Sequence, residues 1–79
     1  MPIEKAARLR QELLLGLLES TYALGRYEEA IAIAQEGLEA SPNVPRFHHL
    51  LARSILSRYN LLDHQTQQHL SASNKQNQN

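Results

Sequence analysis

The chain has 79 residues, no cysteine, and eight basic and eight acidic side chains, which give a formal net charge of zero. A chain of this length forms one small domain, and without cysteine it can use neither disulfides nor thiolate metal sites to stabilise it. Zero net charge excludes a global field that would attract nucleic acid or an anionic membrane, so any electrostatic recognition must be local.

No segment carries the pattern of a secretory leader or a membrane span. Residues 1–10 contain charged side chains and no uninterrupted apolar stretch. The longest apolar-rich run, Leu13–Leu18, is far too short to cross a bilayer. Together with the absence of cysteine, this pattern predicts a soluble, cytoplasmic protein.

The first predicted element is a helix over residues 2–24, in which strong helix formers dominate and only Gly16 intervenes. One apolar face follows the three-and-four spacing of a helix. Its members are Ile3, Ala7, Leu14, Leu17, Leu18, Thr21 and Leu24. Leu9, Leu13 and Leu15 widen the apolar surface, so we expect this helix to meet neighbours on more than one side.

A tight turn and a second helix follow. Gly25 stands where a left-handed residue commonly ends a helix, and residues 27–40 carry a second amphipathic pattern. The apolar face of this second pattern consists of Tyr27, Ala30, Ile31, Ala34 and Leu38. Because the connection is so short, the two helices must pack antiparallel.

A third helix is predicted over residues 44–59, after the helix-breaking segment Ser41–Pro45. Its core face would consist of Phe47, Leu50, Leu51 and Ile55. Residues 61–70 permit a short fourth helix, but few apolar side chains specify it. The tract 71–79 is rich in Asn and Gln, so we expect one helical domain over 1–70 and a disordered tail.

The segment from Gln11 to Val44 has the 34-residue period of tetratricopeptide repeats. Leu14 stands where that repeat has its early Trp, and residues typical of the repeat stand at the other matching positions, namely Leu17, Gly25, Tyr27, Ala30 and Pro42. The unit therefore resembles a tetratricopeptide repeat, which implies an all-α fold with right-handed helix-turn-helix stacking. Three residues depart from the pattern: Leu18 is larger than usual, and Ala34 and Gly37 are smaller. We expect Leu18 to fill the volume that Ala34 leaves.

A second unit in the same register decays after its first helix, because Tyr59 replaces the turn glycine. Since about three such repeats are normally needed for stability, another surface must cover the surplus leucines. We expect self-association, with a dimer favoured, through Leu9, Leu13 and Ile33. The alternative is that the carboxy-terminal segment folds back and completes a four-helix monomer.

The resemblance also implies a peptide groove lined by the first helix of each repeat. Carried over by register, its positions are Glu12, Leu15, Glu19, Tyr22, Arg46, His49, Arg53 and Leu56. Two interpretations stay open: Glu19 and Arg53 form an exposed ion pair, or the basic residues of the third helix bind an acidic peptide. The family's carboxylate clamp for chaperone tails is not expected, because Leu15 and Glu19 stand at the matching positions.

The sequence contains no pattern typical of catalysis or cofactor binding. The histidines, His48, His49, His64 and His69, lack the spacing that aligns ligands on one helix face, so no metal is expected and His48 is predicted to be half-buried. No nucleophile motif and no phosphate-binding glycine loop is present. The sequence predicts a non-catalytic adaptor or assembly factor that binds a polypeptide. A nucleic-acid-binding role for the basic third helix is the competing alternative.

Overall fold

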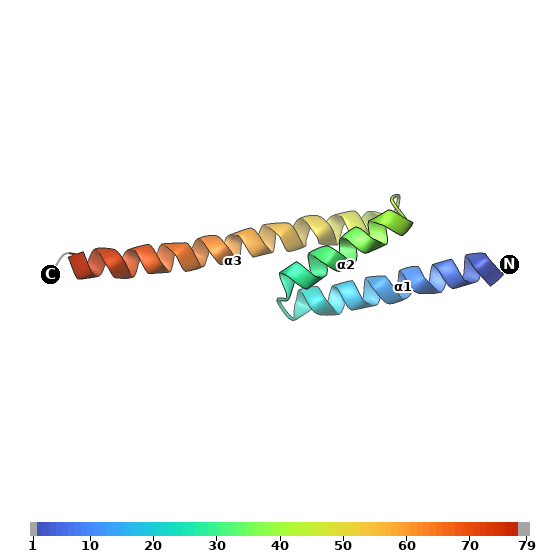
Figure 1. Ribbon diagram of the computed structural model, residues 1–79, viewed down its shortest axis with the longest axis horizontal. Coiled ribbons are helices and arrows are strands. Elements are labelled where there is room, and N and C mark those ends of the chain that lie inside the picture. The colour runs from blue at the N-terminus through green and yellow to red at the C-terminus, as the bar shows by residue number, and fades with distance from the viewer. Residues whose placement is uncertain (1, 78–79) are drawn as a thin grey trace.

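The computed structural model describes residues 2–77, with side chains described for residues 4–68, and consists of three helices (Figure 1). Helix α1 spans Pro2–Ala23, α2 spans Tyr27–Ala40 and α3 spans Pro45–Asn77. Within this range there is no β-strand. The predicted all-α fold, an antiparallel hairpin followed by a third helix, is therefore confirmed.

The turn between α1 and α2 depends on Gly25. Its φ of +78° lies in the left-handed region that favours glycine. The Gly25 amide donates to the Tyr22 carbonyl and the Arg26 amide to the Thr21 carbonyl, each at 3.0 Å. This pair of hydrogen bonds is a Schellman motif, which satisfies the last carbonyls of α1 and starts the reversal.

Residues 41–44 connect α2 to α3. The Ser41 amide donates to the Gly37 carbonyl at 2.8 Å, which ends α2, and Pro45 begins α3 where its missing N–H is not needed. His48 Nε2 lies 2.7 Å from the Pro42 carbonyl oxygen. His48 is exposed, so its predicted half-buried position is wrong. Its ring bonds the backbone of the connection instead of packing in the core.

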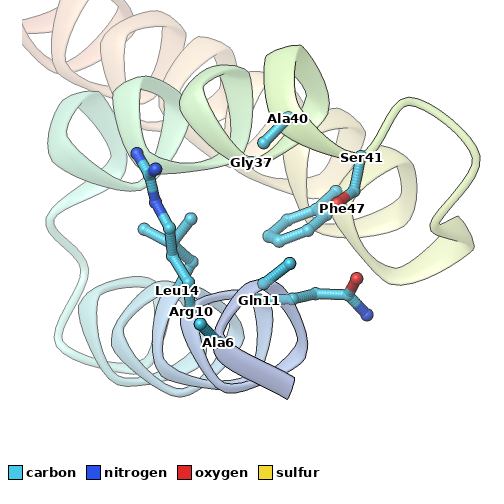
Figure 2. Close-up of a pocket in the computed structure, with 9 residues that line it drawn as sticks. Ala6, Arg10, Gln11, Leu14, Gly37, Ala40, Ser41 and Phe47 are labelled. Atoms are coloured by element: carbon cyan, nitrogen blue, oxygen red, sulfur yellow. The ribbon is translucent and has the colours of Figure 1, made fainter. Parts of the chain in front are cut away.

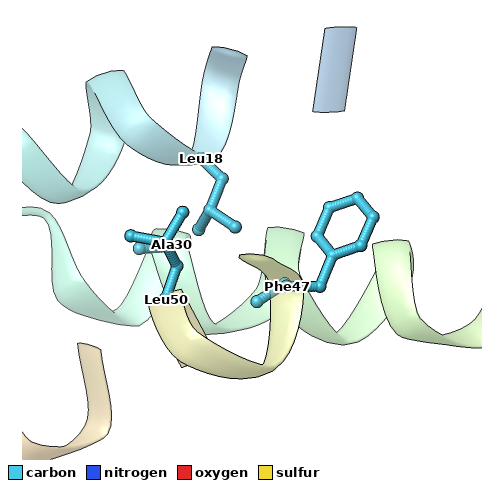
Figure 3. Close-up of a cluster of buried hydrophobic side chains, with 5 residues drawn as sticks. Leu18, Ala30, Phe47 and Leu50 are labelled. Carbon is cyan, nitrogen blue, oxygen red and sulfur yellow. The ribbon is translucent and has the colours of Figure 1, made fainter. Parts of the chain in front are cut away.

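The core is a small cluster at which all three helices meet (Figure 3). The buried apolar side chains are Leu18, Ala30, Ala34, Phe47 and Leu50. Leu18 of α1 and Ala34 of α2 are both fully buried in this cluster. A Cβ atom on Gly37 would overlap the Phe47 ring, so the small residue at position 37 leaves room for that ring.

Four described residues that the sequence pattern assigns to the core are exposed. Leu17 of α1 and Leu24, directly after α1, expose 54% and 71% of their surface, and Ile55 of α3 exposes 44%. Ala7 of α1 is exposed as well. Because α2 and α3 cover only the side of α1 that carries Leu18, its other apolar side faces solvent. The predicted packing on more than one side is therefore absent from the chain's own described fold.

Helix α3 continues without a break past the predicted end at Tyr59. No separate fourth helix forms, and residues 71–77 are helical where a disordered tail is predicted; residues 78–79 lie outside the described part. The physical reason is that the chain has no glycine or proline after Pro45. The side chains of residues 59–68 are all exposed, and the molecule measures 72 × 19 × 13 Å.

Candidate functional site

The predicted groove lies between α1 and α3, which run in the same direction (Figure 1). Four of its eight positions contact one another. Arg46 Nη2 of α3 donates to Glu19 Oε1 of α1. About two helical turns further along α3, Arg53 Nε donates to Tyr22 Oη at 3.3 Å. The structure therefore joins the two walls through one ion pair and one hydrogen bond.

The predicted ion pair between Glu19 and Arg53 does not form, because Glu19 pairs with Arg46 instead. The pairing depends on how α1 and α3 lie against each other across α2, which the sequence alone does not give. Tyr22, three residues after Glu19, contacts Arg53 and Ser57 instead.

Tyr22 is the most connected side chain of the groove. Its hydroxyl shares a 3.3 Å hydrogen bond with Ser57, and the guanidinium carbon of Arg53 lies 5.8 Å from the centre of its ring. The ring of Tyr27 packs against it at 5.7 Å. The bonds from Ser57 and then from Arg53 lower the pKa of Tyr22, and the bond to Tyr22 raises the pKa of Arg53. Ser57 is absent from the predicted groove, although its four-residue spacing from Arg53 could have indicated it.

The α3 wall of the groove is hollowed over a volume of 620 Å³, lined by Pro45, Arg46, His49, Leu50 and Arg53. His49 thus lies where the register predicts. Leu15 is partly buried and packs against the core. Glu12 and Leu56 are exposed, and no described side chain forms a hydrogen bond or ion pair with Glu12. The groove therefore includes fewer residues than predicted. Its polar centre consists of Glu19, Tyr22, Arg46 and Arg53.

The outer side of α1 carries the most exposed leucines of the hairpin. Leu9 and Leu13, both predicted for an oligomer face, are 52% and 74% exposed. Leu17 and Leu24 extend the same surface, and sequence reasoning missed their part in it although Leu17 follows Leu13 by four residues. Ile33 of α2, the third predicted member, is partly buried and packs against the core.

A further hollow lies between the first half of α1, the end of α2 and the start of α3 (Figure 2). It measures 260 Å³ and is lined mainly by small or apolar residues, among them Ala6, Leu14, Gly37 and Phe47. Arg10 reaches across its edge to Glu36 at 3.6 Å. No nucleophile with an adjacent base lines this hollow, so the arrangement can seat an apolar side chain but offers no chemistry.

Among the described residues there is no group of three side chains that could hold a metal ion. His69, one of the four histidines, lies outside the described side chains. No helix of the described part is long and apolar enough to cross a bilayer.

A comparison with protein-family models gives one finding. The tetratricopeptide repeat model matches residues 11–54, more than half of the chain. The matched region includes most of α1, all of α2 and the part of α3 that packs on them. No curated protein and no solved structure is significantly similar to the chain.

Proposed function

Because the chain belongs to the tetratricopeptide repeat family, whose repeats are in general protein-interaction modules, we propose that it is a non-catalytic adaptor or assembly factor that self-associates through α1. The observation that carries this proposal is the exposed leucine surface of α1. Leu9, Leu13, Leu17 and Leu24 expose between 52% and 74% of their surface. Burying one leucine side chain is worth about 1.5–3 kcal/mol, so leaving four in water is costly.

The small size of the core supports the same proposal. Repeats of this kind contact their neighbours and normally stabilise one another in a stack. The described residues form one complete repeat and the first helix of another, and neither α2 nor α3 covers the outer α1 surface. A symmetric dimer is the commonest way for such a surface to be covered.

The groove supports a second, external polypeptide partner. Glu19 already pairs with Arg46, whereas Arg53 is bound to Tyr22 only through Nε. The terminal nitrogens of a guanidinium are the atoms that bind a carboxylate in bidentate fashion. With His49 in the same hollow, Arg53 is suited to an acidic segment of a partner protein.

Sedimentation equilibrium over a range of concentrations tests the self-association. We expect the wild-type mass to rise toward twice the chain mass, and the Leu13→Glu variant to stay monomeric with an unchanged far-ultraviolet circular dichroism spectrum. Ala32→Glu is the matched control, since Ala32 is exposed on α2 away from this surface. A strictly monomeric wild-type protein at high concentration would overturn the proposal.

Binding of a hexaglutamate peptide tests the groove. We expect Arg53→Glu to lose this binding and Arg8→Glu, which reverses an exposed charge near the start of α1, to retain it. Equal binding by both variants would mean that the peptide does not bind in the groove. An oligonucleotide that binds more tightly than the peptide, with steep salt dependence, would favour the competing nucleic-acid role instead.

A further inference from the structure

The two arginines of the α3 wall differ in how much of each guanidinium is left for a ligand. Arg46 and Arg53 both line the hollow of the groove, and their seven-residue spacing places them about 10 Å apart along the helix axis. Arg53 donates through Nε to the uncharged Tyr22 hydroxyl. Arg46 donates through the terminal Nη2 to the Glu19 carboxylate. Among the described residues, Arg53 therefore has no acidic partner, whereas Arg46 has one.

Glu19 reaches Arg46 from the opposite wall of the groove. The two residues belong to α1 and α3 and lie 27 residues apart in the chain. Both side chains remain accessible, with 44% of the Glu19 and 64% of the Arg46 side chain exposed. An ion pair this exposed contributes only a factor of about two to five to an equilibrium constant. Another carboxylate can therefore replace Glu19 at little cost.

We infer that Glu19 is an internal competitor of the acidic segment proposed to bind in this groove. In the free chain its carboxylate occupies Arg46 as a partner's carboxylate would. An acidic segment held by Arg53 competes with Glu19, because both need the same terminal nitrogens of Arg46. The segment that gains most carries two carboxylates about 10 Å apart, which matches the two arginines. This inference rests on the acidic-segment binding proposed above and adds how that binding is regulated.

Glu19 has no role in the core of the chain's own fold. Its side chain is exposed, and within the described part of the chain its carboxylate forms no other ion pair. The neighbouring Leu18 makes the core contact of this turn of α1. Replacing Glu19 therefore changes the groove and leaves the core intact.

Glu19→Gln tests the inference, since glutamine keeps the size of the side chain and removes its charge. We expect isothermal titration calorimetry with hexaglutamate to give a dissociation constant about two- to fivefold lower than that of the wild-type protein. The circular dichroism spectrum should be unchanged.

Glu4→Gln is the matched control, because it removes the same charge from an exposed position of the same helix. Glu4 lies 15 residues, about 22 Å along α1, before Glu19. At about 0.15 M salt a charge is largely screened beyond about 8 Å. Glu4→Gln should therefore change the dissociation constant by less than about 1.5-fold.

Arg46→Lys in the Glu19→Gln background separates a contact with Arg46 from a general effect of charge. Lysine keeps the positive charge but lacks the paired terminal nitrogens that bind a carboxylate. We expect this double variant to lose most of the affinity that Glu19→Gln gains. A gain kept in full would mean that only the lost negative charge matters, and it would overturn the inference.

The outcomes separate this inference from the proposal beneath it. If hexaglutamate binds neither the wild-type protein nor Glu19→Gln, the acidic-segment groove and its internal competitor are both wrong. If the wild-type protein binds the peptide and Arg53→Glu does not, but Glu19→Gln binds no more tightly than Glu4→Gln, the groove stands and the competitor role of Glu19 is overturned.

Discussion

The two halves of α3 have the same backbone but very different surroundings. From Pro45 to Arg58 the helix carries every described α3 side chain that is buried or partly buried, including Phe47, Leu50 and Ser54. From residue 59 to residue 68 every side chain is exposed. The family match ends at Ser54, within the first half. We call residues 45–58 the packed half and residues 59–77 the projecting half.

The length of α2 explains where the packed half ends. Helix α2 has 14 residues, so at 1.5 Å per residue it is about 21 Å long and can cover a similar length of α3. Residues 45–58 are that length. Beyond Arg58 no glycine or proline interrupts the helix. Leu61 and Leu62 still line a shallow hollow with the turn and the start of α2. The comparison teaches that helix propensity sets the extent of α3 and that packing sets which part of it contributes to stability.

Replacing one aromatic residue in each half gives the largest expected difference in the free energy of unfolding. Phe47 is fully buried, whereas Tyr59 is 65% exposed. Phe47→Ala should lower the free energy of unfolding by about 3–5 kcal/mol, and Tyr59→Ala should change it by less than about 0.5 kcal/mol. Urea denaturation followed by circular dichroism measures both. Because Phe47→Ala can unfold so small a domain, Phe47→Leu is the milder variant, with a loss below about 1.5 kcal/mol. Similar losses for Phe47→Leu and Tyr59→Ala would contradict the division.

The sequence predicts the packed half well because local rules decide it. Gly25 fixes the turn through its left-handed φ, and the boundaries of α2 follow from Gly25 and Pro42. The end of α3 lies beyond the expected Tyr59, because a polar composition does not end a helix that contains no glycine or proline. The partner of Glu19 is mispredicted because the pairing depends on the relative heights of α1 and α3. No local pattern reports those heights.

Substituting Gly37 or Gly16 by alanine tests whether the close fit of the packed half on the hairpin depends on the glycine at position 37. Gly37→Ala should lower the free energy of unfolding by about 1–3 kcal/mol, since its methyl group would overlap the Phe47 ring. Gly16→Ala should raise it by about 0.5–1 kcal/mol, because nothing lies within 4 Å and alanine favours the helix. Urea denaturation of dilute protein, in which association does not contribute, measures both changes. If Gly37→Ala were as stable as Gly16→Ala, the ring would not be seated on the glycine. The double variant Gly37→Ala with Phe47→Leu should recover part of the loss.

The smallest expected effect is a change in the pKa of Tyr22, which contacts α3 near the border between the two halves. Tyr22 of α1 binds Ser57, near the end of the packed half, and this hydrogen bond, followed by that from Arg53, lowers the pKa of Tyr22 from its ordinary value of 10.0. In a near-ultraviolet absorbance titration we expect one of the three tyrosines to lose its proton before the others. Tyr22→Phe should abolish this early phase, and Tyr59→Phe, in the projecting half, should leave it intact.

The same contact predicts the sign of the alkaline stability change. Because the pKa of Tyr22 is lower in the folded chain than in the unfolded chain, ionisation stabilises the fold. This contribution is present above the unfolded pKa near 10 and is lost as the pH falls through the folded pKa. Ser57→Ala removes the largest cause and should therefore raise the pKa of Tyr22 toward its ordinary value. An early phase that survives unchanged in Ser57→Ala would mean that the hydrogen bond from Arg53 alone lowers the pKa of Tyr22.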